Sequence, residues 1–126
     1  MRIKPVHLFR IGLGIDMLMH GLVRIPNLQG FVNHSMGGFT TSFLPSILVR
    51  WFLIVLPFIE ALIGLMILIG GKIGRAGFVA GGLLMAVLLF GTTTRQDWPL
   101  ASQQVIYLTA FAIALQFQDQ EAVIAS

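Results

Sequence analysis

Four apolar segments, each long enough to cross a lipid bilayer, limit what this chain can fold into. A helix of about 20 residues is roughly 30 Å long, which matches the hydrocarbon layer of a membrane. Only 10% of the 126 residues are charged and the mean hydropathy is +0.89, values that a soluble domain of this length would not show. The sequence therefore predicts one all-α domain over residues 1–126, an integral membrane four-helix bundle. The predicted spans cover about residues 6–25, 47–69, 76–92 and 100–117.

The first segment is preceded by Arg2 and Lys4, as a secretory signal peptide would be. However, no small-residue cleavage site follows it, and Asp16 interrupts its apolar run. We therefore expect the segment to be retained as a transmembrane helix.

The composition excludes several classes of chemistry. The chain has no cysteine, so it supplies no disulfide, thiolate metal site or iron–sulfur ligand. Eight Lys and Arg against five Asp and Glu are too few charges for a nucleic-acid surface. His7, His20 and His34 do not have the spacing of haem or zinc ligands. We expect no metal, no nucleic-acid partner and no covalently bound cofactor, so a redox role would need a non-covalently bound cofactor, a quinone or a partner subunit.

The first predicted span carries ionisable residues on one side. At 100° per residue, Arg10, Asp16, His20 and Arg24 fall within an arc of about 120°. A lone charge near the bilayer centre costs at least roughly 2.5 to 3.5 kcal/mol, so such residues usually face a bundle interior. The sequence therefore predicts a polar helix face that turns toward the other spans.

The second span offers a partner in Glu60, one turn after Pro57. Measured from the span ends, Arg10 lies about 8 Å deep and Glu60 about 13 Å deep on the same side. This offset of about 5 Å is within reach of an arginine side chain, and Asp16 and His20 lie one helical turn apart. We therefore predict a buried chain of Arg10, Glu60, Asp16 and His20 that opens outward to Arg24 and Gln104.

The fourth span adds Gln104 and Tyr107, which share a face with Phe111. Two interpretations of the resulting cluster stay open. It binds a polar headgroup such as a quinone, with His20 and an acid moving protons, or it is an ion-pair network that only fixes helix register. The predicted ligand-binding residues are Arg10, Asp16, His20, Glu60, Gln104 and Tyr107, and no catalytic residue is assigned.

The remaining segments suggest packing and interface roles. Residues 26–45 contain three phenylalanines among Gly, Asn and Ser, which is typical of a loop or short helix on the membrane interface, either an anchor or a lid. Gly77 and Gly81 make a small-xxx-small pair, which favours a packing face. Residues 70–75 are expected to form a short link, and the polar tail from Gln118 is expected to fray.

Four spans place both termini on one side of the membrane. That side carries Arg2, Lys4, Lys72 and Arg75, the last two in a very short connection, whereas the other carries Arg24, Arg50 and Arg95. Because positive charge accumulates in cytoplasmic loops, we expect both termini in the cytoplasm.

Several of these features together resemble the DoxX-like family of small four-helix membrane proteins. They are the sequences RIGLG at 10–14 and HGLVR at 20–24, an acid at Glu60, and the turn GGKIGR at 70–75. The resemblance implies an inner (plasma) membrane location and a possible link to quinone, because the family is named for subunits similar to those of a thiosulfate:quinone oxidoreductase. It transfers no catalytic residue.

The leading functional hypothesis is an accessory or quinone-interacting subunit of a redox system. The alternative is a non-catalytic scaffold or assembly partner, recognised through the Phe-rich connection and the Gly77/Gly81 face. A transporter or proton path is a weaker third hypothesis, since four spans would have to oligomerise to form a pore. The expected partners are the lipid bilayer and other membrane subunits or a second copy of the chain.

Overall fold

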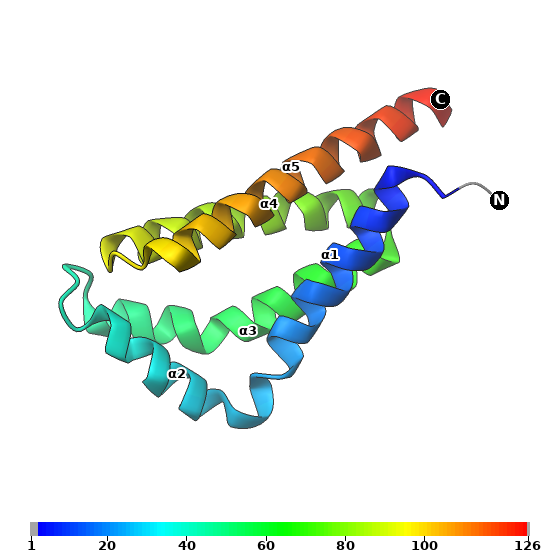
Figure 1. Ribbon diagram of the computed structural model, residues 1–126. Helices are drawn as coiled ribbons and strands as arrows, with labels where there is room; N and C mark the ends of the chain where they lie inside the picture. Colours follow the sequence, from blue (N-terminus) through cyan, green and yellow to red (C-terminus); the bar gives the residue numbers. More distant parts are fainter. Residues whose placement is uncertain (1–2, 126) are drawn as a thin grey trace.

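The computed structural model describes residues 3–125, and the regular structure in that part of the chain is helical (Figure 1). Four segments are long and apolar enough to cross a membrane: Pro5–Phe39, Ser46–Ile69, Gly71–Thr94 and Trp98–Ala122. The predicted all-α, four-span architecture is therefore confirmed. In chain order the helices are α1 Pro5–Leu22, η1 Ile25–Asn27, α2 Leu28–Met36, η2 Gly37–Phe39, α3 Ser46–Ile69, α4 Gly71–Thr94 and α5 Trp98–Ala125.

The helices form a bundle in which α3 and α4 are central. In Figure 1, α4 and α5 run side by side, whereas α1 lies at an angle across α3. The start of α1 and the end of α5 lie at the same end of the bundle, where Lys4 Nζ is 2.6 Å from Glu121 Oε2. We call this the terminal end. Both ends of the described chain are thus on one side, as an even number of spans requires.

The backbones of α1 and α3 come into close contact at glycines. A Cβ atom on Gly21 would lie 2.6 Å from the backbone nitrogen of Ala61, and one on Gly64 would lie 2.7 Å from the carbonyl oxygen of Gly14. Small residues at such positions let transmembrane helices approach each other closely. These contacts fix an antiparallel register in which Gly21 lies opposite the middle of α3 and Gly14 lies near Leu68.

The Gly77/Gly81 face is also a packing face, as predicted. A Cβ atom on Gly77 would lie 2.8 Å from the side chain of Ile67, and one on Gly81 would lie 2.7 Å from the ring of Phe111. Helices α3 and α5 therefore occupy this face. It is not open to a partner protein, so the scaffold hypothesis is wrong in using this face for recognition.

The first span is a broken helix, which differs from the prediction. Helix α1 ends at Leu22 rather than at residue 25, and a 3₁₀ turn that contains Pro26 leads into α2. Helix α2 packs on α3, and Val32 is buried there. Of the two forms predicted for residues 26–45, a loop or a short helix, the structure shows the short helix α2. Proline lacks an amide hydrogen and fixes its own φ angle, so the helix stops near Pro26, and apolar packing on α3 restarts it.

Two further boundaries differ from the prediction for local reasons. The expected link at residues 70–75 shrinks to a tight turn, because Gly70 and Gly71 adopt positive φ angles of 81° and 62° and α4 begins at once. Helix α5 continues past residue 117 to Ala125 instead of fraying. Its polar end is held by Arg75, whose Nε donates to Asp119 Oδ1 at 2.8 Å, and by the Lys4–Glu121 pair.

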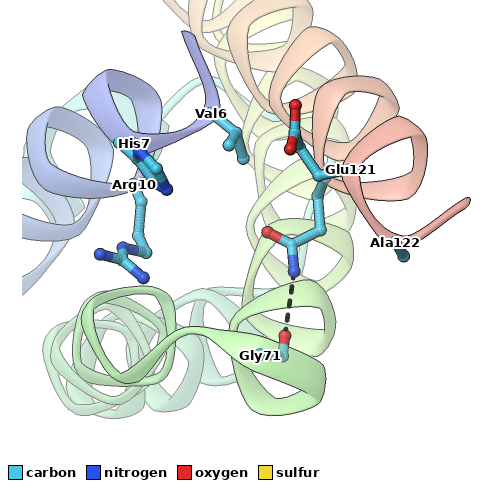
Figure 2. Close-up of a pocket in the computed structure, with 7 residues that line it drawn as sticks. Val6, His7, Arg10, Gly71, Glu121 and Ala122 are labelled. Atoms are coloured by element: carbon cyan, nitrogen blue, oxygen red, sulfur yellow. Dashed lines mark hydrogen bonds between the residues drawn. The ribbon is translucent and has the colours of Figure 1, made fainter. Parts of the chain in front are cut away.

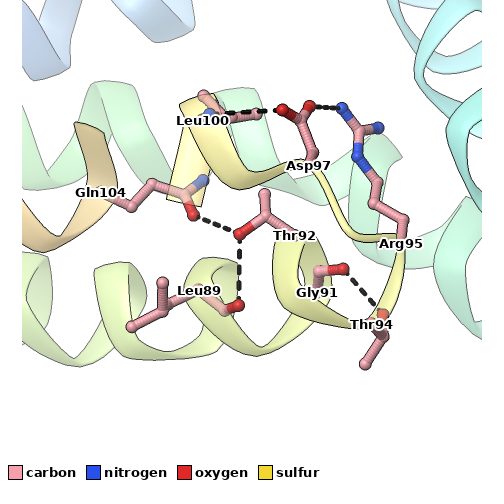
Figure 3. Close-up of polar contacts among 8 residues, drawn as sticks. All are labelled: Leu89, Gly91, Thr92, Thr94, Arg95, Asp97, Leu100 and Gln104. Carbon is pink, nitrogen blue, oxygen red and sulfur yellow. Dashed lines mark hydrogen bonds and ion pairs between the residues drawn. The ribbon is translucent and has the colours of Figure 1, made fainter. Parts of the chain in front are cut away.

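The turn between α4 and α5 is organised by Asp97 (Figure 3). Its Oδ1 accepts a hydrogen bond from the backbone N–H of Leu100 at 3.2 Å, and its Oδ2 accepts one from the Arg95 guanidinium. A side-chain oxygen that accepts from the third residue of a helix is an N-cap. The hydrogen bond from Arg95 and then that from Leu100 lower the pKa of Asp97 below its ordinary value.

Replacement of Gly21 by alanine should lower the melting temperature, because the new Cβ would overlap the carbonyl oxygen of Pro57 and push α1 away from α3. Overpacking of this kind costs about 1–3 kcal/mol. Thermal unfolding in mild detergent, followed by tryptophan fluorescence, measures the loss. Gly12→Ala is the matched control, since a Cβ there meets nothing within 4 Å. Equal melting temperatures for the two variants would contradict the α1–α3 register.

Replacement of Asp97 by alanine should cost about 0.5–2 kcal/mol, because α5 loses its N-cap, whereas Asp97→Asn should keep most of that stability. Because folding lowers the pKa of Asp97, its charge stabilises the fold fully above about pH 4, the ordinary range of aspartate. This contribution is lost as the pH falls through the lowered value. The melting-temperature difference between wild type and Asp97→Asn should therefore shrink on acidification. A pH-independent difference would argue against the ionised cap.

Candidate functional site

Two groups of polar side chains lie along α1 and the turn that follows it. The first consists of Asp16 and His20 on α1 and Tyr107 on α5, and we call it the Asp16 cluster. The second is the ion pair of Arg24 and Glu60. The two groups follow one another along the chain and together bring polar side chains of α1, α3 and α5 into one region of the bundle.

The Arg24–Glu60 pair sits at the break in the first span. Nη1 of Arg24 donates to Oε1 of Glu60 at 2.8 Å, and Glu60 is only 4% exposed. The guanidinium carbon of Arg24 also lies 4.5 Å from the centre of the Phe31 ring on α2, a cation–π contact. Arg24 therefore joins α2 and α3 at the point where α1 has ended.

The predicted partner of Glu60 was Arg10, and that prediction is wrong. Nη1 of Arg10 would lie 2.7 Å from a Cβ on Gly70, so its side chain reaches the turn between α3 and α4. Ten residues of helix, roughly 15 Å, separate Gly70 from Glu60. The predicted Arg10–Glu60 pair requires the two spans to end at the same level along the bundle axis. The glycine contacts instead shift α1 along α3, so that Gly21 lies beside Ala61. Arg24, rather than Arg10, is then next to Glu60.

The Asp16 cluster joins α1 to α5. The hydroxyl of Tyr107 donates to Oδ1 of Asp16 at 3.3 Å. Nδ1 of His20 lies 2.7 Å from the backbone oxygen of Asp16 and 3.4 Å from its carboxylate. Since a carbonyl oxygen only accepts, this contact assigns the proton to Nδ1 and leaves Nε2 of a neutral His20 as an acceptor. The predicted neighbours Asp16 and His20 are thus together, and Tyr107 joins them.

The side chains of this cluster are not fully enclosed. Asp16 is 30% exposed and His20 is 41% exposed as side chains, whereas Glu60 is 5% exposed. Asp16 lies eleven residues after Pro5, or roughly 16 Å along α1, which is near the middle of a bilayer about 30 Å thick. Hydrogen-bonding groups are therefore accessible at membrane depth.

Gln104 belongs to a different place in the bundle. Its Oε1 accepts a hydrogen bond from Oγ1 of Thr92 at 2.7 Å, and Thr92 also donates to the carbonyl oxygen of Leu89 (Figure 3). Both side chains are buried between α4 and α5 near their shared turn. The pair satisfies two polar groups in the packing of these helices, and the side-chain hydrogen bond of Gln104 is made to Thr92 rather than to the Asp16 cluster.

The polar groups in the described part of the chain are well matched. No buried side-chain nitrogen or oxygen among these residues lacks a hydrogen-bond partner. In the same residues, no group of three or more His, Asp or Glu side chains is placed to hold a metal ion. The arrangement can donate and accept hydrogen bonds and can hold a proton at His20.

Sequence reasoning overlooked how the first span is broken and which glycines set its position. Gly14 and Gly21 lie two helical turns apart on α1, and this spacing already places them on one face. Pro26, two residues after Arg24, marks the end of the helix. Arg24 is already on the predicted inward face, so the glycine spacing is the further signal that could have indicated the position of α1 along α3.

Comparison of the chain with protein-family models, curated proteins and solved structures gave no match. The resemblance to the DoxX-like family therefore stays a prediction from short motifs. What the structure shows is four helical segments long and apolar enough to cross a membrane, with polar side chains placed between α1, α3 and α5.

Removing one partner of the buried ion pair should destabilise the protein strongly. Arg24→Gln leaves Glu60 buried without a counter-charge, a change that costs about 3–5 kcal/mol in other proteins. The double variant Arg24→Gln with Glu60→Gln should recover part of that loss, because neither residue is then charged. Lys4→Gln, which breaks an exposed pair, should cost less than about 1 kcal/mol. Thermal unfolding of these variants in mild detergent measures the coupling, and additive losses would rule out a direct pair.

Proposed function

We propose that the Asp16 cluster binds the polar ring of a lipid-soluble quinol or quinone. We further propose that the protein is an accessory subunit of a redox system in the inner membrane. The observation that carries this proposal is the partial exposure of Asp16 and His20 at membrane depth. Ionisable side chains within a membrane are costly to expose to lipid, so they normally face a partner, a ligand or a water-filled cavity.

The chemistry of the cluster suits a ring that carries hydroxyl groups. Nε2 of His20 is an acceptor and can take a hydrogen bond from a ring hydroxyl. When His20 also takes the proton, the Asp16 carboxylate 3.4 Å from Nδ1 stabilises the imidazolium. Tyr107 holds Asp16 in position through its hydroxyl. A quinol supplies two electrons and two protons on oxidation, and in this proposal the electrons pass to an acceptor in a partner subunit of the redox system.

The ion pair beside the cluster has a supporting role in this proposal. Arg24 neutralises the charge of Glu60 and thereby fixes the end of α1. His20 lies one helical turn before Arg24, so this pair also positions His20. Of the predicted ligand residues, His20 is therefore assigned to the ring, whereas Asp16, Tyr107 and Glu60 position it and balance its charge. Gln104 contributes to helix packing, and Arg10 lies at the terminal end.

We propose that the terminal end faces the cytoplasm. Lys4, Lys72 and Arg75 are found there, and positively charged residues in short connections favour the cytoplasmic side of inner-membrane proteins.

The alternative function is a scaffold or assembly partner. Phe43, in the segment before α3, is 77% exposed, and its ring packs edge-on against Phe90 at 6.4 Å. With the Gly77/Gly81 face filled by α3 and α5, this aromatic surface is where a scaffold would bind its partner. Recovery of a stoichiometric membrane protein in mild detergent, lost in Phe43→Ser, would favour this alternative.

A short-chain benzoquinol should raise the melting temperature of the purified protein in nanodiscs. At a ligand concentration of 100 times Kd, the gain in stability is about 2.7 kcal/mol. His20→Phe should abolish the shift, because it removes the acceptor, and Tyr107→Phe should reduce it. Met19→Phe is the matched control, since Met19 is an exposed apolar residue adjacent to His20. The absence of a shift in the wild type, or an equal shift in His20→Phe, would refute the quinol site.

A further inference from the structure

A pocket of about 250 Å³ opens at the terminal end of the bundle, away from the Asp16 cluster. It lies between the start of α1, the start of α4 and the end of α5 (Figure 2). A water molecule takes up about 30 Å³ of liquid volume, so the pocket has room for roughly eight waters or one small headgroup. The residues that decide its chemistry are Val6, His7, Arg10, Gly71, Gln118 and Glu121.

The pocket contains a cation without a counter-charge from the described residues. In Figure 2 the side chain of Arg10 extends from α1 toward the turn that precedes Gly71. Within residues 3–125, no carboxylate lies within ion-pair distance of Arg10, whereas the other lining charge, Glu121, is bound by Lys4 at 2.6 Å. Lys4 is not part of the lining, but it offsets the charge of Glu121, so these three side chains together leave the charge of Arg10 unbalanced.

The neighbouring groups add to this positive character. Asp119, the other acid near the end of α5, is held by two hydrogen bonds from Arg75 at 2.8 and 3.2 Å. Gln118 Nε2 donates to the carbonyl oxygen of Gly71, which fixes the first residue of the 24-residue α4 against α5. The positive end of the α4 dipole thus lies at the pocket.

The position of the pocket indicates where its ligand comes from. It lies where the membrane-spanning helices end, so it faces the headgroup layer rather than the hydrocarbon. One wall is the apolar side chain of Val6, and Leu8 on the same helix is 62% exposed to the surroundings of the bundle. A ligand with a charged head and apolar chains fits this combination, and basic pockets between transmembrane helices bind anionic lipid headgroups.

We propose that this pocket binds the phosphate group of an anionic phospholipid, with Arg10 as the principal ligand. The Arg10 guanidinium donates paired hydrogen bonds to phosphate oxygens. His7, whose Nδ1 accepts a hydrogen bond from the backbone N–H of Lys4, offers its Nε2–H as a second donor, and the acyl chains lie along the exposed apolar side of α1. The site is separate from the proposed quinol site and does not depend on it.

Nanodiscs of phosphatidylcholine, with or without 20% phosphatidylglycerol, test the proposal. The wild type should melt several degrees higher in the anionic discs, and Arg10→Gln should lose at least half of that difference. Arg10→Lys should keep part of it, because it retains the charge. Arg50→Gln is the matched control, since Arg50 is an exposed cation near the start of α3, away from the pocket. An equal lipid effect in wild type and Arg10→Gln, or none in the wild type, would overturn the proposal.

Two further measurements complete the test. The first distinguishes a lipid phosphate from a soluble phosphate, and the second replaces Arg10→Gln if that variant does not fold. Inorganic phosphate or glycerol 3-phosphate, added to the protein in neutral detergent, should produce no comparable shift; a shift as large as that of the lipid would overturn the lipid assignment. If Arg10→Gln does not fold, Glu121→Gln replaces it. That variant removes the negative charge from the lining, so native mass spectrometry should detect at least a twofold gain in retained phosphatidylglycerol. Unchanged or reduced retention would contradict the site.

Discussion

The close contact between the backbones of α1 and α3 is the constraint on which the polar chemistry of this protein depends. Gly14, Gly21 and Gly64 remove the side chains that would hold the helices apart, and the carbonyl and amide groups of one helix then touch the other. In a membrane, where apolar side chains gain little by leaving lipid, such close packing supplies much of the association between helices. The contact also fixes the height of α1, and with it the partners of each ionisable residue.

One consequence is a broken first span. With Gly21 opposite the middle of α3, helix α1 ends well inside the length of its neighbour, and the chain continues through η1 into α2. Irregular backbone within a membrane is tolerated where protein surrounds it. Here the side chain of Arg24 surrounds part of the break, because its guanidinium binds buried Glu60 on α3 and packs on Phe31 of α2. The chain is thus held to α2 and α3 where α1 ends.

The charged residues therefore differ between the middle of the bundle and its terminal end. Near the middle, the hydrogen bond of Tyr107 to Asp16 joins α5 to α1, and that of Arg24 to Glu60 joins the turn after α1 to α3. At the terminal end, exposed ion pairs tie α5 to α1 and α4, and Arg10 remains as an additional cation. If the four candidate spans cross a bilayer, a ligand reaches the middle of the bundle through lipid, whereas the terminal end lies at the headgroup layer. The two proposed sites follow from this difference in surroundings.

The sequence by itself determined the all-α architecture, the four spans and the meeting of Asp16 with His20. These depend on apolar segment length and on one helical turn, which are local properties. Only the tertiary structure decided that Glu60 pairs with Arg24 rather than with Arg10, and that Gln104 pairs with Thr92. Helical periodicity gives the direction of a side chain but not the height of one helix against another. That height is set by backbone contact at glycines that lie far apart in the chain.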